Sequence, residues 1–264
     1  PSRAKPLVSA LSRAPPAMES RLMFTAMRAR RCAGSPATHA RDPDETMRRD
    51  SHLLLELLTP IVKAWGSEYC LKANEIAIQI LGGYGFTREY PVEQNYRDNR
   101  INPIHEGTNG IQALDLLGRK AMMQDGAALK LLMAKIAQTC IEAGADDTLK
   151  PLADQLAIAA KHAIDATRAA GKRMAAGEPR LALANASHYM TSLGHLTIAW
   201  LWLQQATIAQ KALPEASGGD RDFYAGKVQA CRFFFATEVP LIEHAARLVR
   251  DAEPSAFDMQ AEWF

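Results

Sequence analysis

Hydrophobic residues recur at helical spacing along most of the chain, and the first clear run lies between residues 50 and 80. Apolar side chains follow one another there every three or four positions, which predicts a long amphipathic helix beginning near Asp50 or Ser51. Pro60 lies inside the run and predicts a kink or a restart. The expected core face of this helix is Leu54, Leu58, Ile61, Val62, Trp65, Tyr69, Ala73, Ile76, Ala77 and Ile80.

The same spacing returns after residue 106 and continues almost to the end of the chain. Further helices are expected over residues 106–120, 129–141, 149–174, 181–213 and 221–249. Glycine and aspartate mark breaks at residues 124–126 and 144–147. No alternating pattern of useful length predicts a strand. We therefore expect an all-α fold, arranged as an antiparallel helical bundle.

The first 49 residues do not fit this pattern. They are rich in proline, alanine, serine and arginine and show neither helical nor alternating spacing over any length. We expect this segment to be poorly ordered or atypical of the fold. Its basic composition also resembles an organelle transit peptide, but the start at Pro1, the several prolines and the lack of an amphipathic stripe argue against that interpretation.

Composition narrows the possible classes of function. The chain has 264 residues, of which 48% are hydrophobic, and its formal charge is only +2. The 31 basic and 29 acidic residues are interspersed after the first fifty positions, so no nucleic-acid partner is expected. Four distant cysteines indicate neither a disulfide framework nor a zinc site, which favours thiols in a reducing, cytoplasmic compartment. The richest apolar run, residues 196–203, is too short to span a bilayer.

Candidate chemistry is concentrated between residues 79 and 120. Glu106 stands just before a predicted helix whose apolar face is Ile111, Leu114 and Leu117. The glycines at 107 and 110 would let a ligand approach the main chain, and the first turn of a helix offers N–H groups to a phosphate. The alternative is that Thr108 or Asn109 is an ordinary N-cap and that Glu106 is a surface carboxylate. Spacing alone slightly favours this alternative.

A family resemblance favours the functional interpretation of Glu106 over the ordinary helix cap. The run LGGYGFTREYPVEQNYRDNRINPIHEGTNGIQ resembles the C-terminal signature of the acyl-CoA dehydrogenases, in which a glycine-rich turn precedes E-Y-P-V-E, R-D and I-x-E-G-T-x-x-I-Q. The following LDLLGRK is more similar to the branch that has a C-terminal extension, which includes 3-methylmercaptopropionyl-CoA dehydrogenases. The match covers about forty consecutive positions, so it is specific.

The resemblance implies a domain organisation. Members of the family have an N-terminal helical domain, a middle β-domain that holds the flavin and a C-terminal four-helix domain. Residues 50–125 resemble the second half of that last domain, and residues 126–264 resemble its helical extension. Because no segment resembles the β-domain, the chain alone would lack most of the flavin and substrate pocket.

The resemblance also implies a reaction. It is the FAD-dependent α,β-dehydrogenation of an acyl-CoA thioester to the trans-2-enoyl-CoA, with Glu106 as the base that removes the α-proton. Substrate contacts are implied for His105 and Gly107, although the family more often has tyrosine at the former position. FAD contacts are implied for Thr108, Gly110, Gln79, Ile80, Leu81, Gly82 and Gly83.

The last five of those residues match a segment that reaches the FAD of a neighbouring subunit, so a homo-oligomer, at least a dimer, is implied. Electron-transfer flavoprotein is the family's usual electron acceptor. Many relatives have glutamine where this chain has Gly110, so a side-chain contact is lost there. The alternative function is a non-catalytic helical module that oligomerises or binds partners, which the missing β-domain favours for this chain alone.

Other conspicuous residues have structural interpretations. Arg97 and Asp98 are expected to form an ion pair in the turn before Glu106. The seven-residue separation of His188 and His195, with no third ligand in view, favours surface or core histidines over a metal site. The residues expected in the bundle core are Met122, Met123, Trp200 and Trp202.

Overall fold

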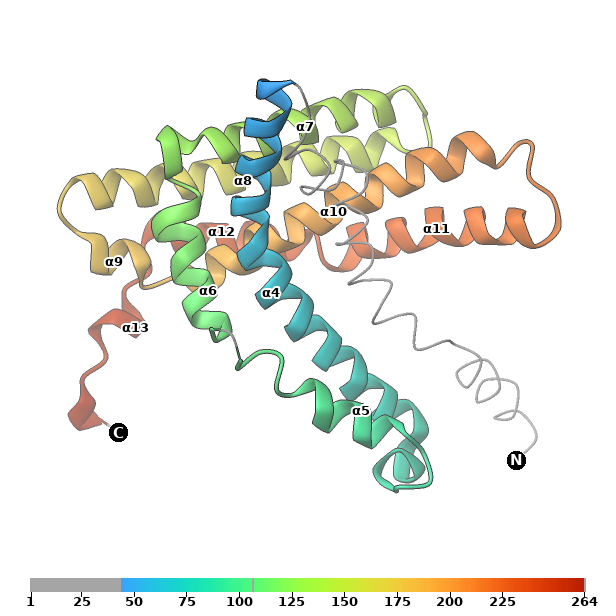
Figure 1. Ribbon diagram of the computed structural model, residues 1–264, viewed down its shortest axis with the longest axis horizontal. Helices are drawn as coiled ribbons and strands as arrows, with labels where there is room; N and C mark the ends of the chain where they lie inside the picture. The colour runs from blue at the N-terminus through green and yellow to red at the C-terminus, as the bar shows by residue number, and fades with distance from the viewer. Residues whose placement is uncertain (1–43, 106, 264) are drawn as a thin grey trace. The chain divides into compact units, whose positions relative to one another are not determined.

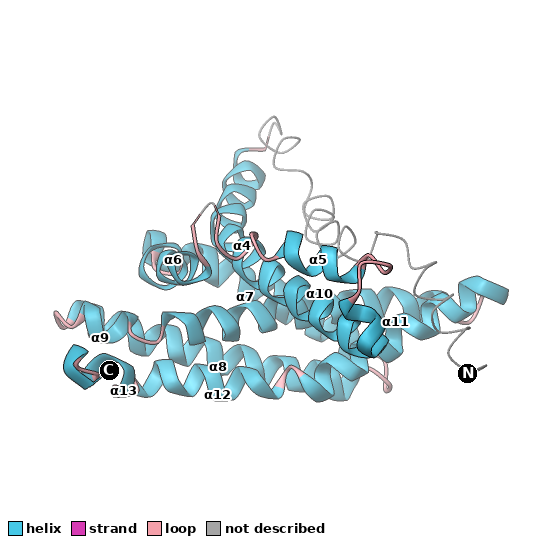
Figure 2. Cartoon of the chain, turned by 90° about the horizontal axis from the view of Figure 1, so that it is seen from below, coloured by secondary structure: helices cyan, strands magenta, loops and turns pink. Residues whose placement is uncertain are grey.

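The computed structural model describes residues 44–105 and 107–263, and every regular element in them is a helix (Figure 1). Figure 2 shows the same described residues as helix and loop without a strand, which confirms the all-α expectation. The chain divides into two compact units, residues 1–106 and 107–264. The expected atypical segment at residues 1–49 lies mostly outside the described residues.

Unit 1 is built on one long helix, α4 (Glu45–Leu81). The helix begins earlier than expected because Asp44 caps it, its Oδ1 accepting the Thr46 amide at 2.8 Å. The helix α4 runs through Pro60 as one element, so the expected restart is absent. A proline removes only one backbone hydrogen bond, and the buried side chains of Leu57 and Ile61 on either side of it hold the helix in place.

Burial along α4 differs from the predicted core face. Leucines and Trp65 in its first half are buried, but Val62, Ile76 and Ile80 are 44%, 50% and 55% exposed. The core expectation was therefore wrong for these three residues and for Ala73, which is also exposed. Helical spacing identifies an apolar stripe, but it does not say whether another element covers the stripe.

The end of α4 is set by glycine. Gly82 has φ +59° and its amide donates to the Gln79 carbonyl, which is typical of a glycine that ends a helix. The 3₁₀ turn η1 (Gly82–Phe86) and the helix α5 (Val92–Asn99) then pack against α4. The Asn74 side chain donates to the Asn95 carbonyl at 3.4 Å and links the two helices. The sequence analysis predicted no helix between residues 80 and 106, so it missed α5.

Unit 2 is an antiparallel helical bundle with short additions at its ends. The chain passes through α6 (Asn109–Asp115), the π-helical turn η2 (Leu116–Lys120), α7 (Met123–Gly144), α8 (Lys150–Ala175), α9 (Pro179–Leu183), α10 (Ala186–Ala212), α11 (Gly218–Thr237), α12 (Pro240–Asp251), α13 (Ser255–Asp258) and the 3₁₀ turn η3 (Ala261–Trp263). Neighbours in the sequence pair as α7 with α8 and α10 with α11, and α12 returns to pack on α8 and α10.

The helix α10 lies at the centre of this bundle. It packs against α6, α7, α8, α11 and α12, and buried residues follow one another through most of its length (Figure 1). A helix covered on so many sides has no polar stripe. Threonine hydroxyls of α10 donate to its own backbone, as those of Thr197 and Thr207 do to the carbonyls four residues earlier.

Two predicted helices are each divided in the structure. Residues 181–213 form α9 and α10, because the chain turns at Asn185, whose side chain donates to the Glu253 carbonyl at 2.8 Å. Residues 221–249 form α11 and α12, because Pro240 cannot continue a helix and begins a new one. The break predicted at residues 124–126 is present as three consecutive left-handed residues.

Tryptophan links α10 to α7. The Trp200 indole Nε1 donates to the Thr139 hydroxyl at 2.8 Å, and both side chains are buried. Trp200 therefore lies in the core as expected, whereas Trp202, Met122 and Met123 are only partly buried.

A second buried polar pair links α8 to α10. The Thr167 hydroxyl donates to the Ala163 carbonyl at 2.7 Å, so the Tyr189 hydroxyl donates to Thr167, 2.8 Å away. Tyr189 is fully buried, and this burial raises its pKa, so the phenol keeps its proton.

We expect Tyr189→Phe to lower the free energy of unfolding by about 1 kcal/mol, because it removes only the donor of this bond. Thr167→Val should cost more, about 1 to 3 kcal/mol, because it leaves the Tyr189 hydroxyl buried without an acceptor. Urea unfolding would measure both. A double variant costing the full sum of the two single variants would contradict the coupling.

Candidate functional site

Glu106, the base that the family resemblance implies, lies outside the described residues. The two units divide directly after it. The structure therefore describes its neighbours on either side. His105, at the end of unit 1, is exposed, and its Nδ1 lies 3.1 Å from the Ile101 carbonyl oxygen.

Gly107 opens unit 2 in a conformation that favours glycine. Its φ is +94°, and a Cβ added there would lie 2.8 Å from Nε2 of Gln112. Any other residue would strain the backbone and displace the glutamine side chain. The local fold thus requires a residue without a side chain directly after Glu106.

Thr108 is the N-cap residue of α6, as one of the alternatives expected. Its carbonyl accepts the Gln112 amide at 3.0 Å, but its side chain makes no capping hydrogen bond to the helix. Thr108 and Gly110 are both exposed. The Thr108 hydroxyl is thus at the surface and not used in capping.

The buried face of α6 differs from the predicted one. Leu117 is fully buried as expected, but Ile111 and Leu114 are exposed, and Ala113 and Leu116 are buried instead. The π-helical turn η2 explains part of this, because the Ala121 amide reaches back five residues to the Leu116 carbonyl. That turn shifts the helical phase, which a regular three-to-four spacing does not anticipate.

The other candidate cofactor residues form the end of α4 and its glycine turn. Leu81 is partly buried, and the remaining four are exposed: Gln79, Ile80, Gly82 and Gly83. Two aromatic side chains next to them, Tyr84 and Phe86, are also exposed, the latter by 85%. This end of unit 1 therefore carries apolar and aromatic groups on its surface, here called the glycine-turn surface, which comprises residues 76–86.

Gly85 differs from the glycines around it because it is buried against α4. A Cβ at this position would lie 2.9 Å from the Cα of Ile78. A Cβ on Gly83 would have no heavy atom within 4 Å. The turn thus depends on Gly85 for its close approach to the helix.

The expected ion pair between Arg97 and Asp98 is not present. Arg97 Nε lies 2.8 Å from a Glu93 oxygen, and this pairing raises the Arg97 pKa. Asp98 instead accepts from the Gln94 side chain at 2.6 Å. The expectation was wrong because both residues lie in α5, where side chains four positions apart face each other and adjacent ones do not.

Within the described ranges, no group of three or more His, Cys, Asp and Glu side chains is arranged to hold a metal ion. His188 is exposed. His195 is buried, with Nδ1 2.7 Å from the Thr191 carbonyl oxygen and Nε2 3.2 Å from a Glu238 carboxylate oxygen. Two further hydrogen-bonding groups therefore occupy the nitrogens of this histidine.

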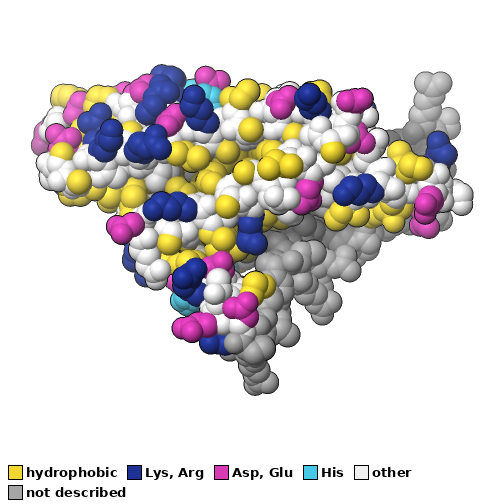
Figure 3. Space-filling view, turned by 90° about the horizontal axis from the view of Figure 1, so that it is seen from above, with side chains coloured by type: hydrophobic (Ala, Val, Ile, Leu, Met, Phe, Trp, Pro, Cys, Tyr) yellow, Lys and Arg dark blue, Asp and Glu magenta, His cyan; other side chains and the backbone are white. Residues whose placement is uncertain are grey.

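The charge distribution on one face of the molecule gives no sign of a large basic or acidic patch. Basic and acidic side chains are interspersed over the face drawn in Figure 3. Across the part of the chain that the structure describes, no helix combines the length and the apolar character needed to cross a bilayer.

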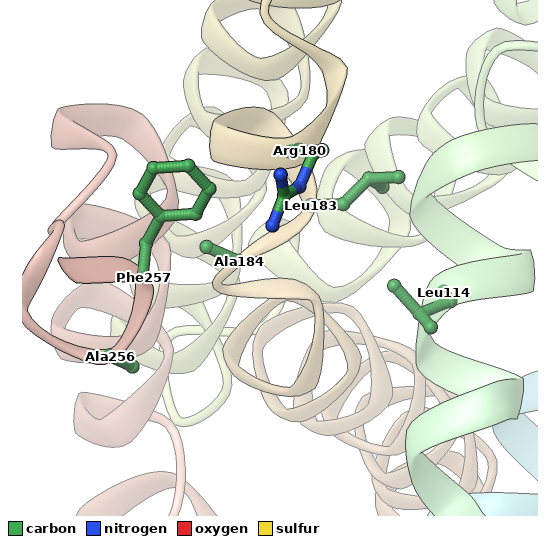
Figure 4. A pocket seen from close by; sticks show the side chains of 6 residues that line it. All are labelled: Leu114, Arg180, Leu183, Ala184, Ala256 and Phe257. Atoms are coloured by element: carbon green, nitrogen blue, oxygen red, sulfur yellow. The ribbon is translucent and has the colours of Figure 1, made fainter. Parts of the chain in front are cut away.

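A pocket of about 440 Å³ in unit 2 was not expected from the sequence. Its lining comes from α6, from α9 and the residue after it, and from α13, with Arg180 standing between Phe257 and Leu183 (Figure 4). The Arg180 guanidinium carbon lies 5.5 Å from the centre of the Phe257 ring. No sequence motif signals this pocket, because its residues are far apart in the chain.

Comparison with protein families agrees with the motif. The model described as "Acyl-CoA dehydrogenase, C-terminal domain" matches residues 21–122, and "Acetyl-CoA dehydrogenase C-terminal like" matches residues 132–260. The chain belongs to the acyl-CoA dehydrogenase family. The family resemblance read from residues 79–120 is thereby confirmed.

Curated relatives extend well beyond this chain. The broad-specificity linear acyl-CoA dehydrogenase FadE5 of Mycobacterium tuberculosis is 33% identical over 79% of the chain and 35% of its own length. The 3-methylmercaptopropionyl-CoA dehydrogenase of Ruegeria pomeroyi is 34% identical over 76% of the chain and 34% of its own length. The chain thus spans about a third of the length of these relatives.

Solved structures show the same fold. Caenorhabditis elegans ACDH-11, solved in complex with C11-CoA, aligns with a TM-score of 0.63 at 19% identity, over 95% of this chain and 41% of that one. A Bacillus anthracis acyl-CoA dehydrogenase complexed with FAD aligns with a TM-score of 0.56 at 24% identity, over 73% of this chain and 32% of that one.

We expect Gly85→Ala to destabilise unit 1 by about 1 to 3 kcal/mol, because the new methyl group would collide with the α4 backbone. Gly83→Ala is the matched control and should change stability by less than about 0.5 kcal/mol, since open space surrounds it. Hydrogen exchange of the α4 and α5 amides would report the difference. Equal exchange rates in the two variants would contradict the packing described for Gly85.

Proposed function

We propose that this chain is the C-terminal part of an FAD-dependent acyl-CoA dehydrogenase that converts an acyl-CoA thioester to the trans-2-enoyl-CoA. The observation that carries the proposal is the I-H-E-G-T-N-G-I-Q run in a chain of this family, with Gly107 at positive φ. A backbone without a side chain directly after Glu106 leaves room for a thioester to lie against the main chain.

In this proposal Glu106 is the base. Its carboxylate takes the α-proton of the thioester, and an apolar acyl chain beside it would raise its affinity for that proton toward the neutral range. His105 and Gly107 contact the substrate on either side of the base. FAD, when bound, supplies the acceptor for the hydride that leaves the β-carbon.

The residues of this chain suit part of a flavin site. The surface hydroxyl of Thr108, which caps nothing, and the exposed Gly110 would hold the FAD of the same subunit. The five residues 79–83 of the glycine-turn surface would hold the FAD of a neighbouring subunit. The exposed Tyr84 and Phe86 support a subunit contact there, because an assembled dimer would cover them.

The proposed assembly is therefore a homo-oligomer, and electron-transfer flavoprotein is its proposed electron acceptor. One relative, from Acetobacterium woodii, is named as a subunit of the caffeyl-CoA reductase–Etf complex and is 43% identical over 22% of this chain. The second candidate function is a non-catalytic helical module for oligomerisation. The observation favouring it is that all regular elements of the described residues are helical, so they include no β-domain.

Replacing Glu106 tests the catalytic proposal in a protein that has all three domains. We would join this chain to the N-terminal two-thirds of the Mycobacterium tuberculosis relative. Glu106→Gln should then lower the rate of acyl-CoA dehydrogenation by about 10² to 10⁴-fold, because the amide cannot accept the proton. Glu89→Gln, an exposed acid near the glycine turn, is the control and should leave the rate unchanged.

The visible flavin spectrum of the joined protein separates the outcomes. Loss of turnover with FAD retained supports the role of Glu106. Full turnover by the Glu106→Gln protein with FAD retained would show that another group is the base. A flavin-loaded protein with no turnover even before substitution would favour the non-catalytic module.

We expect the isolated 264-residue chain to bind FAD weakly and to be inactive, because it spans only about a third of its relatives. Equilibrium dialysis with FAD and an acyl-CoA oxidation assay would measure this. A yellow, active preparation of the isolated chain would contradict the expectation.

A further inference from the structure

The pocket of unit 2 has features of a binding site that the proposed dehydrogenation does not use. Its walls are Leu114 of α6, Arg180 and Leu183 of α9, Ala184, and Ala256 and Phe257 of α13. One cation thus faces an otherwise apolar lining (Figure 4). It is an open depression of the surface with a volume of about 440 Å³.

Two contacts hold these walls together. The buried Asn185 donates to the Glu253 carbonyl at 2.8 Å, which ties the start of the α13 segment to the junction of α9 and α10. On the other side, Leu183 packs onto Gly118, where an added Cβ would lie only 3.3 Å from the leucine Cδ2. Contacts within the bundle therefore position the α9 wall, and the segment that leads to α13 is tied at its start.

Arg180 is held in the pocket by an aromatic ring. Its guanidinium carbon lies 5.5 Å from the Phe257 ring centre, an arrangement that orients the group while leaving its N–H donors available. The side chain of Arg180 is exposed, so a ligand can reach it from solvent.

Two carboxylates close in sequence to Arg180 and Phe257 are engaged elsewhere. Glu178 pairs with Arg173 at 3.5 Å, and both carboxylate oxygens of Glu253 bind Ser255. Among the residues that the structure describes, no ion pair includes Arg180. The positive charge at the pocket is therefore not neutralised by the protein itself.

We propose that this pocket binds a small organic anion whose carboxylate or phosphate pairs with Arg180 and whose apolar part lies against Leu183, Leu114 and Phe257. The planar guanidinium offers two parallel N–H donors to either head group. The leucine and phenylalanine side chains cover an alkyl chain or a ring. The proposal does not depend on the dehydrogenase function, because none of these residues belongs to the E-G-T motif or to the glycine-turn surface.

The test uses three ligands that share one alkyl chain and differ in the head group: hexanoate, hexyl phosphate and the neutral hexanamide. Methyl signals of Leu114 and Leu183 and the Nε–H signal of Arg180 would be followed by NMR during titration of the full chain. We expect the two anions to shift all three signals saturably. Hexanamide should bind at least about tenfold more weakly, since it cannot form the charge-assisted pair.

Two arginine variants identify the partner of the anion. Arg180→Gln should weaken binding of the anions by about tenfold, which corresponds to the loss of one charge-assisted contact. Arg232→Gln is the matched control, because Arg232 is also exposed in unit 2 but does not line the pocket. Thermal unfolding of each variant confirms that the bundle is intact.

Each outcome decides the proposal. Saturable binding that falls in Arg180→Gln and not in Arg232→Gln supports it, and binding of only one anion would also assign the head group. Equal binding of hexanamide, equal affinity in Arg180→Gln, or shifts that do not saturate would overturn it.

Discussion

The burial of α10 is the constraint on which the structure of unit 2 depends. Five helices pack around this one, so nearly every side of it lies in the core. Several of its polar side chains find partners inside the bundle, through the backbone of α10, Thr139 of α7 and Thr167 of α8. These bonds fix the order in which the neighbouring helices are placed.

The same constraint explains where the chain turns. A helix surrounded by others must end where the bundle ends, and at its N-terminal end Asn185 provides both the turn and the tie to Glu253. That tie determines where the segment with Phe257 begins. The pocket beside Arg180 thus depends on the turn at Asn185 that precedes α10. Its residues come together only because the bundle has this topology.

The regular helices could be predicted from the sequence because apolar spacing reports the period of a helix directly. Features that depend on capping, on proline or on the pairing of side chains could not be predicted in this way. Asp44 extends α4 by capping, and α4 tolerates Pro60 because its neighbours are buried. Arg97 pairs with Glu93 because both lie in α5, four residues apart. None of these is visible in the spacing of apolar residues, since each depends on a contact between a side chain and a particular backbone or helix.

Prediction of the candidate site rested on a motif, and the structure explains why a motif was needed. Glu106 and Gly107 stand at the division between two compact units, so no single apolar pattern includes both. The packing of α6 on α10 positions the residues that follow the division, whereas α4 and α5 organise unit 1, which ends at Glu106. A substitution in the core of either unit therefore acts on the residues of one side of the motif only, and it leaves the motif sequence itself unchanged.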